Sequence, residues 1–152
     1  MQIIVGAKMN KEDVAKILLE IKAVSLKTNP PFTWASGIKS PIYCDNRLIL
    51  SYPDKRQKIV DAFLETIEKN NLKFDVVAGV ATSGIPWASM IALKINKPLI
   101  YVRDKAKEHG KGNQIEGKLE KGQKVILIED LISTGGSSFS VVEAIREAEG
   151  IV

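Results

Sequence analysis

Two adjacent acidic residues, followed by a run of small hydroxyl and glycine residues, are the part of this sequence best suited to chemistry. Glu129 and Asp130 follow the apolar run VILI and precede LISTGGS, residues 131–137. Glycines let a backbone approach a phosphate closely, and the serine and threonine hydroxyls add donors. We therefore predict that residues 131–137 bind a phosphate at the N-terminus of a following helix, where free N–H groups favour an anion.

The two acids cannot hold that phosphate, because they would repel it. They could instead hold sugar hydroxyls or a cation, and they could stabilise positive charge on a reacting carbon. A phosphorylated sugar satisfies both parts of the motif. No lysine follows Gly136, as G-x-x-x-x-G-K-[ST] requires, and no G-x-G-x-x-G follows a strand, so the usual nucleotide-binding loops are excluded. Taken alone, the motif fits a plain glycine–serine turn equally well.

The chain around this motif alternates between strand and helix patterns. Apolar runs predict strands at 74–81, 98–102 and 124–130, and helical spacing predicts helices at 84–95 and 137–149. Such alternation implies an α/β fold with a parallel sheet covered on both sides, in which ligands bind at the carboxyl ends of the strands. Glu129 and Asp130 would then lie at the carboxyl end of a central strand. The loops expected beside them are 81–84, 103–117 and 130–137.

The first third of the sequence predicts a smaller segment that precedes this core. Asn10 is an N-cap signal for a helix at 11–22, and a second helix should begin at Pro53 and end near Asn70. Between them, prolines and glycine favour ordered loops, with a strand or extended edge at 41–44. We expect a single domain over 1–152, with the N-terminal helix and a hood at about 1–50 and the core at about 51–152.

Composition limits the classes of protein that this chain can belong to. Its 152 residues are 45% hydrophobic and 26% charged, typical of one soluble domain. No apolar run is long enough for a membrane span, and the apolar stretch at the N-terminus is too short for a signal peptide. We therefore expect a cytoplasmic protein with no membrane partner. A net charge of +4 suits an anionic ligand. No helix-turn-helix or basic stripe with aromatics predicts nucleic-acid binding.

Three stretches resemble one known family. VILIEDLISTGGSS, residues 125–138, resembles the 5-phosphoribosyl 1-diphosphate (PRPP) motif of type I phosphoribosyltransferases. FTWASGIKSPIYCDNR (32–47) and YVRDKAKEHGKGNQIEG (101–117) are similar to segments of the orotate phosphoribosyltransferases, and the resemblance covers essentially the whole chain. It implies transfer of ribose 5-phosphate from PRPP to orotate, giving orotidine 5′-phosphate and pyrophosphate in pyrimidine nucleotide synthesis.

The resemblance also assigns roles to residues of the acidic motif and of the first segment. Glu129 and Asp130 are implied to engage the ribose hydroxyls and to be catalytic. Ser133 is implied to contact orotate as well as phosphate, and Tyr43 and Cys44 to line the pyrimidine pocket. The residues implied to bind the 5′-phosphate are Leu131, Ile132, Ser133, Thr134, Gly135, Gly136 and Ser137.

The basic stretch 101–117 is implied to meet the pyrophosphate group. Arg103, Lys107 and His109 match the family's mobile loop, which acts across the interface of a homodimer, and Lys107 and His109 are implied to be catalytic. By itself, without the phosphate motif, this stretch fits a solvated basic loop better than a functional one. Asp104 stands where some relatives carry a lysine, so the charge of the loop is shifted. Mg²⁺ is expected through diphosphate and ribose oxygens, with no protein ligand assigned.

The turn after the first predicted core strand, residues 79–86, is a second candidate for pyrophosphate. A nest of backbone N–H groups is the functional interpretation and a plain turn is the alternative. The resemblance favours the functional one and implies a strained peptide near Ala81 and Thr82. Ala35, Thr82 and Ser83 replace lysine-bearing positions of other members, so no pyrophosphate-binding lysine is assigned there.

Two other functions remain open, and the end of the sequence carries an expectation of its own. The fold also serves phosphoribosyltransferases for other bases and PRPP-sensing regulators that bind nucleic acid. Gly150 is the expected C′ glycine of the last helix, and Ile151 and Val152 are expected to begin another strand. Family members continue further, so we expect this chain to be a piece that lacks the far part of its sheet and leaves the acid-bearing strand as an edge.

Overall fold

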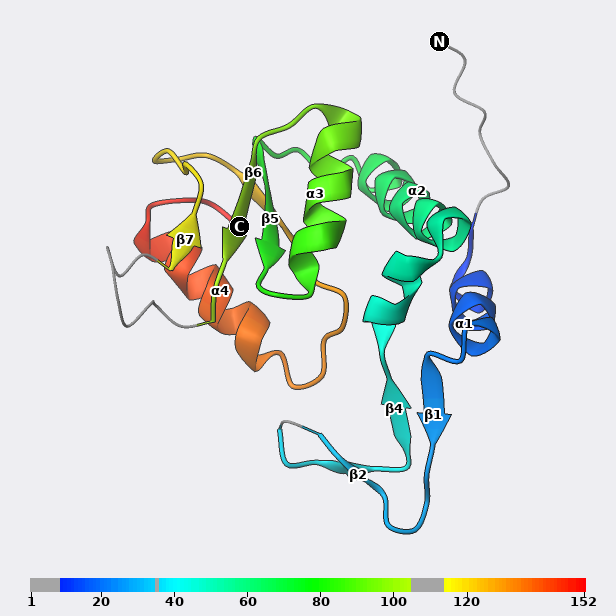
Figure 1. Cartoon of the computed structure of the whole chain (residues 1–152). Coiled ribbons are helices and arrows are strands. Elements are labelled where there is room, and N and C mark those ends of the chain that lie inside the picture. The colour runs from blue at the N-terminus through cyan, green and yellow to red at the C-terminus, as the bar shows by residue number, and fades with distance from the viewer. Residues whose placement is uncertain (1–8, 35, 105–113) are drawn as a thin grey trace. The chain divides into compact units, whose positions relative to one another are not determined.

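The computed structural model describes residues 9–34, 36–104 and 114–152 (Figure 1). The chain divides into two compact units, Met1–Lys69 and Asn70–Val152. The boundary lies after the helix that the sequence analysis assigned to the start of the core. The single domain expected over 1–152 stays a prediction.

The first unit begins with helix α1 (Lys11–Glu20). Asn10 caps it, because the Asn10 side chain accepts from the Asp13 N–H at 2.9 Å and Asp13 accepts from the Asn10 N–H at 3.1 Å. The helix ends two residues before the predicted end at Lys22. Lys22 has φ 56°, a left-handed conformation that closes the last turn through Lys22 N–H to Leu19 and Ala23 N–H to Leu18.

Two small antiparallel pairs follow, in the segment expected to form a hood. Strand β1 (Val24–Leu26) pairs with β4 (Ile42–Cys44), which confirms the extended edge predicted at 41–44. Strand β2 (Phe32–Thr33) pairs with β3 (Lys39–Ser40), and the Trp34 indole donates to the Ile42 carbonyl at 3.1 Å. A 3₁₀ helix η1 (Asn46–Ser51) then leads into α2 (Pro53–Lys69), whose bounds match the prediction.

The second unit is built on a four-stranded sheet in the order β7-β6-β5-β8. Its strands are β5 (Val76–Val80), β6 (Leu99–Val102), β7 (Ile115–Glu116) and β8 (Val125–Ile128). The pairs β5–β6 and β5–β8 are parallel, as predicted, whereas β7 is antiparallel to β6 and was not expected inside a loop. Helices α3 (Gly84–Ile95) and α4 (Gly136–Glu147) follow β5 and the 129–135 loop.

Strand β8 is the outermost strand of the sheet that the described residues form, as the sequence analysis expected for the acid-bearing strand of this chain. The alternation of strands and helices alone had suggested a central strand. Its outer side carries one parallel bridge, Lys124 to Ile151. The Val125 N–H donates to the Ile151 carbonyl at 2.7 Å. The further strand expected to begin at Ile151 stays a prediction.

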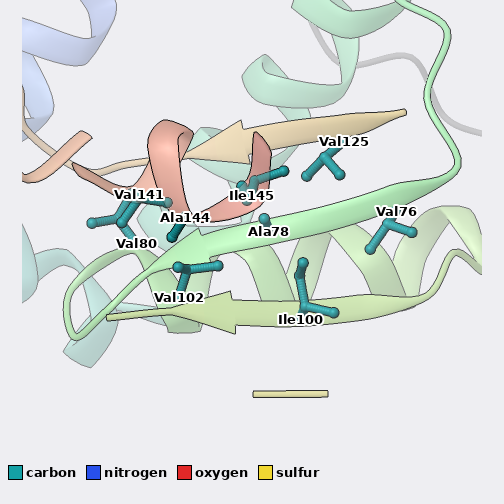
Figure 2. Close-up of a cluster of buried hydrophobic side chains, with 9 residues drawn as sticks. All are labelled: Val76, Ala78, Val80, Ile100, Val102, Val125, Val141, Ala144 and Ile145. Carbon is teal, nitrogen blue, oxygen red and sulfur yellow. The ribbon is translucent and has the colours of Figure 1, made fainter. Parts of the chain in front are cut away.

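Strand β5 is buried on both faces, as its continuous apolar run predicts. Val76, Ala78 and Val80 point toward one side and pack with side chains of β6, β8 and α4 (Figure 2). Gly79 faces α3 on the other side, where a Cβ atom added to it would lie 3.0 Å from the Cβ atom of Ala88. The α4 members of the packed cluster are Val141, Ala144 and Ile145. This packing fixes α3 and α4 on opposite faces of the sheet.

The end of α4 differs from the sequence prediction. Glu149, with φ 60°, occupies the left-handed C′ position, and Gly150 follows it. The N–H of Gly150 donates to the Ile145 carbonyl at 2.9 Å, completing the helix stop. Glycine is needed at 150 for space, because an added Cβ atom would lie 2.8 Å from Ile145 Cγ2. Among the helices that the structure describes, none is long and apolar enough to cross a membrane.

Candidate active site

The carboxyl ends of the three parallel strands meet at one edge of the sheet. Val80 pairs with Val102 and Gly79 with Ile128, so β5, β6 and β8 end at nearly the same level. The Ala81 N–H also donates to the Val102 carbonyl at 2.8 Å. The loops that follow these strands therefore start side by side, as the sequence analysis predicted. This edge carries Glu129, Asp130 and the start of the predicted phosphate loop.

Helix α4 begins with an N-terminus suited to an anion. Its N-cap is Gly135, which has φ 82° and no side chain with which to cap the first turn. Because an L-residue rarely adopts this conformation, glycine sets the turn that leads into the helix. The loop before it is open to solvent: Leu131, Ile132, Ser133, Thr134, Gly136 and Ser137 are exposed. First-turn N–H groups and loop hydroxyls are thus accessible to a phosphate.

Glu129 and Asp130 directly follow β8 and are both half-buried. Burial, and then the charge of the neighbouring Asp130 and its hydrogen bond, raise the pKa of Glu129 to about 7. Ser138 on α4 donates from its hydroxyl to Glu129 Oε2 at 3.4 Å. Glu129 therefore exchanges its proton near neutral pH. A positive charge beside Glu129 would favour its ionised form.

Arg103 lies at the same sheet edge, directly after β6. It is half-buried, and its Nε atom is 3.7 Å from Glu116 Oε1. The next residue, Asp104, is exposed, and its carbonyl accepts from the Ser140 hydroxyl at 2.7 Å, which ties the end of β6 to α4. Lys107 and His109, and also Ala35, lie outside the described residues.

The turn between β5 and α3 is the second candidate anion site at this edge. The peptide bond between Ala81 and Thr82 is cis, in the place where the resemblance implied an unusual peptide. Ser83 occupies the N-cap of α3 but makes no capping hydrogen bond through its side chain, and Ile85 N–H donates to the Thr82 carbonyl at 3.2 Å. Thr82 is exposed. The backbone nest for pyrophosphate at this turn stays a prediction.

The residues implied to contact the pyrimidine belong to the first unit. Tyr43 is exposed and its ring centroid lies 5.6 Å from that of Phe32. Cys44 donates through its thiol to Asn46 Oδ1 at 3.1 Å, and Cys44 is the only cysteine of the chain. These contacts hold the end of β4 in a defined conformation. Whether Tyr43 and Cys44 bind a base stays a prediction.

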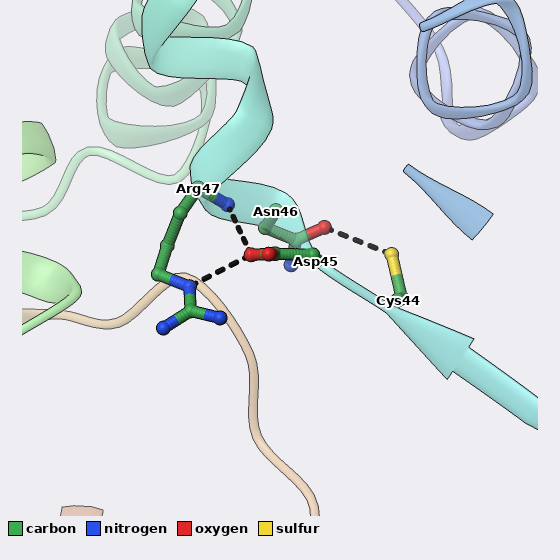
Figure 3. A network of polar contacts seen from close by, with 4 residues as sticks. All are labelled: Cys44, Asp45, Asn46 and Arg47. Carbon is green, nitrogen blue, oxygen red and sulfur yellow. Dashed lines mark hydrogen bonds and ion pairs between the residues drawn. The ribbon is translucent and has the colours of Figure 1, made fainter. Parts of the chain in front are cut away.

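A polar network that the sequence analysis did not single out lies directly after Cys44 (Figure 3). Asp45 accepts from the Arg47 backbone N–H at 3.2 Å and from Arg47 Nε at 2.7 Å. The hydrogen bond from the Arg47 side chain lowers the pKa of Asp45. Aspartate two residues before an arginine at the start of η1 was the available signal, because aspartate caps helices by accepting from N–H groups there.

Within the described ranges, no three His, Cys, Asp or Glu side chains are grouped so that they could hold a metal ion. The family model described as "Phosphoribosyl transferase domain" matches residues 49–150. The chain belongs to this family. The phosphoribosyltransferase match includes all of β5, β6 and β8 and the loops at their carboxyl ends.

Similar proteins carry more specific names. The chain is 64% identical over 138 residues to an orotate phosphoribosyltransferase of Listeria innocua, covering 91% of this chain and 66% of that protein. It therefore spans just under two thirds of this relative's length. An orotate phosphoribosyltransferase structure from Aeropyrum pernix has a TM-score of 0.77 at 34% identity, covering 91% of this chain and 76% of that one. The structure of the Leishmania donovani UMP synthase has a TM-score of 0.79 at 33% identity. The match covers 95% of this chain and 30% of that one.

Proposed function

We propose that this chain carries the PRPP-binding part of an orotate phosphoribosyltransferase, which transfers ribose 5-phosphate from PRPP to orotate. The observation that carries the proposal is the glycine-capped N-terminus of α4, which follows the Glu129–Asp130 pair after the loop residues 131–134. It offers N–H groups to a phosphate and carboxylates to a sugar within one loop. The identity to the Listeria innocua enzyme supports the choice of orotate. Pyrimidine nucleotide synthesis and a cytoplasmic location belong to the same proposal.

The acids act on the ribose in this proposal. The loop 131–137 binds the 5′-phosphate, which places the ribose hydroxyls near Glu129 and Asp130. When the bond to diphosphate breaks, the anomeric carbon becomes electron-poor. Ionised carboxylates near it stabilise that charge. Because the pKa of Glu129 is about 7, developing positive charge would draw Glu129 into its ionised form during the reaction.

Cations must meet the diphosphate that leaves. Arg103 is the described residue that we assign to it, and by sequence similarity we add Lys107 and His109. Mg²⁺ fits this arrangement, because phosphate and ribose oxygens are the hard ligands it prefers and the neighbouring carboxylates favour a cation. When bound, Mg²⁺ would neutralise charge on the diphosphate and so aid its departure. We assign no protein ligand to the ion.

The contacts to orotate and the homodimer rest on sequence similarity alone. We propose that Ser133, Tyr43 and Cys44 contact orotate. We also propose that the 103–117 stretch serves the site of a partner subunit, because closed two-fold dimers allow such exchange between identical chains.

A substrate panel tests the proposed function. Purified protein is mixed with PRPP and Mg²⁺, and pyrophosphate release is followed with orotate, uracil, adenine or hypoxanthine as the acceptor. We expect release with orotate and none above background with the other bases. Release with another base alone would replace orotate as the substrate. No release with any base, together with salt-dependent binding of RNA or DNA, would favour a PRPP-sensing regulator.

A further inference from the structure

Both the backbone N–H and the backbone carbonyl of Arg103 are hydrogen-bonded to Gln114, directly before β7. In the antiparallel pair of β6 and β7, Tyr101 lies opposite Glu116 and Val102 opposite Ile115. The pairing continues one residue further, because the Arg103 N–H donates to the Gln114 carbonyl at 3.0 Å. The Gln114 side chain returns a hydrogen bond through Nε2 to the Arg103 carbonyl at 2.7 Å. Arg103 thus begins from a defined position at the end of β6.

The side chain of Arg103 lies between a carboxylate and an aromatic ring. Arg103 directly follows β6 in extended pairing and lies two residues from Tyr101, so the two share a face. Glu116 stands opposite Tyr101 on that same face. Arg103 Nε is 3.7 Å from Glu116 Oε1, and Arg103 Cζ is 5.7 Å from the centroid of the Tyr101 ring. An arginine at this distance from an aromatic ring is attracted to it. Two side chains therefore restrict the guanidinium group.

The atoms that face each other in the Arg103–Glu116 pair are buried, whereas other parts of both side chains are exposed. Arg103 Nε and Glu116 Oε1 are both buried atoms. The Arg103 side chain nevertheless keeps 37% of its surface exposed, and the Glu116 side chain 26%. Since Nε is covered, the surface of Arg103 that a ligand can reach lies elsewhere on the side chain. A guanidinium has five N–H donors, so pairing at one nitrogen leaves others for phosphate oxygens.

We propose that Glu116 is a positioning residue, which holds the Arg103 guanidinium in the orientation that binds the diphosphate group of PRPP. This proposal rests on the proposed function. A free arginine side chain loses much rotational freedom when it binds an anion. Glu116 restricts that freedom before the ligand arrives, so that less of the binding free energy is lost on ordering the side chain. Glu116 itself need not touch the substrate.

Steady-state kinetics of Glu116→Gln test this role, because glutamine keeps the size of the side chain and removes its charge. We expect KM for PRPP to rise roughly three- to tenfold, the range for a partly buried ion pair. KM for orotate should stay within about twofold, because Arg103 is not assigned to orotate. The value of kcat should fall as well, because Arg103 also meets the diphosphate as it leaves. Glu120→Gln is the matched control, since it removes the same charge from an exposed pair with Lys118 and should leave all three constants unchanged.

A double-mutant cycle separates positioning from a general structural effect. In an Arg103→Ala background, Glu116→Gln should raise KM for PRPP no further, because the side chain to be positioned is gone. Independent, additive effects of the two changes would overturn the proposal. So would an unchanged KM for PRPP in Glu116→Gln alone. A lower KM would also overturn it, because it would mean that the carboxylate repels the ligand.

An error in the proposed function and an error in the role of Glu116 give different experimental results. If the wild-type protein does not turn over PRPP with orotate, the proposed function is wrong. In that case calorimetric titration with pyrophosphate and Mg²⁺ still tests Glu116. Wild-type binding that weakens roughly three- to tenfold in Glu116→Gln supports the positioning role. Equal binding by both proteins, or no binding by wild type, overturns it.

Discussion

Gly84, the first residue of α3, lies so close to Ile128 that a Cβ atom added to the glycine would be 2.5 Å from the Ile128 carbonyl oxygen. Ile128 is the last residue of β8, directly before Glu129. The end of β8, which leads into the acidic pair, therefore packs closely against the start of α3. This backbone contact joins the two candidate anion sites at the sheet edge.

The first prediction follows from that contact. Gly84→Ala should destabilise the fold by roughly 2 kcal/mol, because a backbone carbonyl cannot move away as a flexible side chain would. Gly136→Ala is the control, since its added Cβ atom would meet nothing closer than Thr134 Oγ1 at 3.9 Å. Urea unfolding of both variants measures the difference. Equal midpoints for the two variants would show that the contact is looser than described.

The second prediction concerns Asp130. If this carboxylate stabilises a cationic transition state, Asp130→Asn should lower kcat by roughly a hundredfold while the unfolding midpoint changes little. Stopped assays of pyrophosphate release measure kcat, and thermal unfolding checks the fold. A variant in which both Glu129 and Asp130 are neutral and turnover is nevertheless that of wild type would remove the acids from the mechanism.

The third prediction uses the pKa of about 7 for Glu129. Because the fold disfavours the ionised form, Glu129 adds no penalty below its ordinary value of 4.5 and destabilises the fold increasingly as the pH rises through 7. Glu129→Gln should therefore be more stable than wild type at pH 8, by roughly 1 kcal/mol after allowance for solvent screening, and about equal near pH 4.5. Unfolding midpoints at the two pH values measure this.

Glu120→Gln is the control for that experiment. The hydrogen bond and charge of Lys118 lower the pKa of Glu120, so the sign of its effect is opposite. Its removal should give no gain in stability at pH 8. A gain at pH 8 for both variants would point to relief of general charge repulsion and not to the setting of Glu129.

The fourth prediction concerns the proposed homodimer. A chain with Asp130→Asn mixed with a chain with Lys107→Ala should recover about a quarter of wild-type activity, since half the dimers are mixed and each has one intact site. Each variant alone should have little activity. No recovery after mixing and subunit exchange would mean that Lys107 serves its own subunit.

Local sequence signals predicted the long elements of this fold well. Pro53 and the apolar spacing after it set α2, and the run 84–95 gave α3 with its observed bounds. Short elements were missed, because the two residues of β7 are too few for a periodic pattern and are defined only by pairing with Tyr101 and Val102. The stop of α4 was placed at Gly150, although Glu149 takes the left-handed conformation.

Some features of the candidate site could likewise be predicted from local sequence patterns, and others could not. That Glu129 and Asp130 follow a strand and precede a helix could be predicted from alternation along the sequence. The raised pKa of Glu129 could not, because it depends on burial by residues distant in sequence. The pairing of Arg103 with Glu116 also needs the register of two strands, which no local pattern contains.

Calorimetric titration of PRPP with Mg²⁺ into the wild-type protein, Gly135→Val and Ser137→Ala tests the phosphate loop most directly. We expect saturable binding by wild type and a loss of roughly 1 kcal/mol in Ser137→Ala, which removes one neutral hydrogen bond. Gly135→Val should abolish binding, because valine cannot adopt the φ of 82° that leads the loop into α4. Equal affinities in all three proteins, or no binding by wild type, would contradict a PRPP site at residues 131–137.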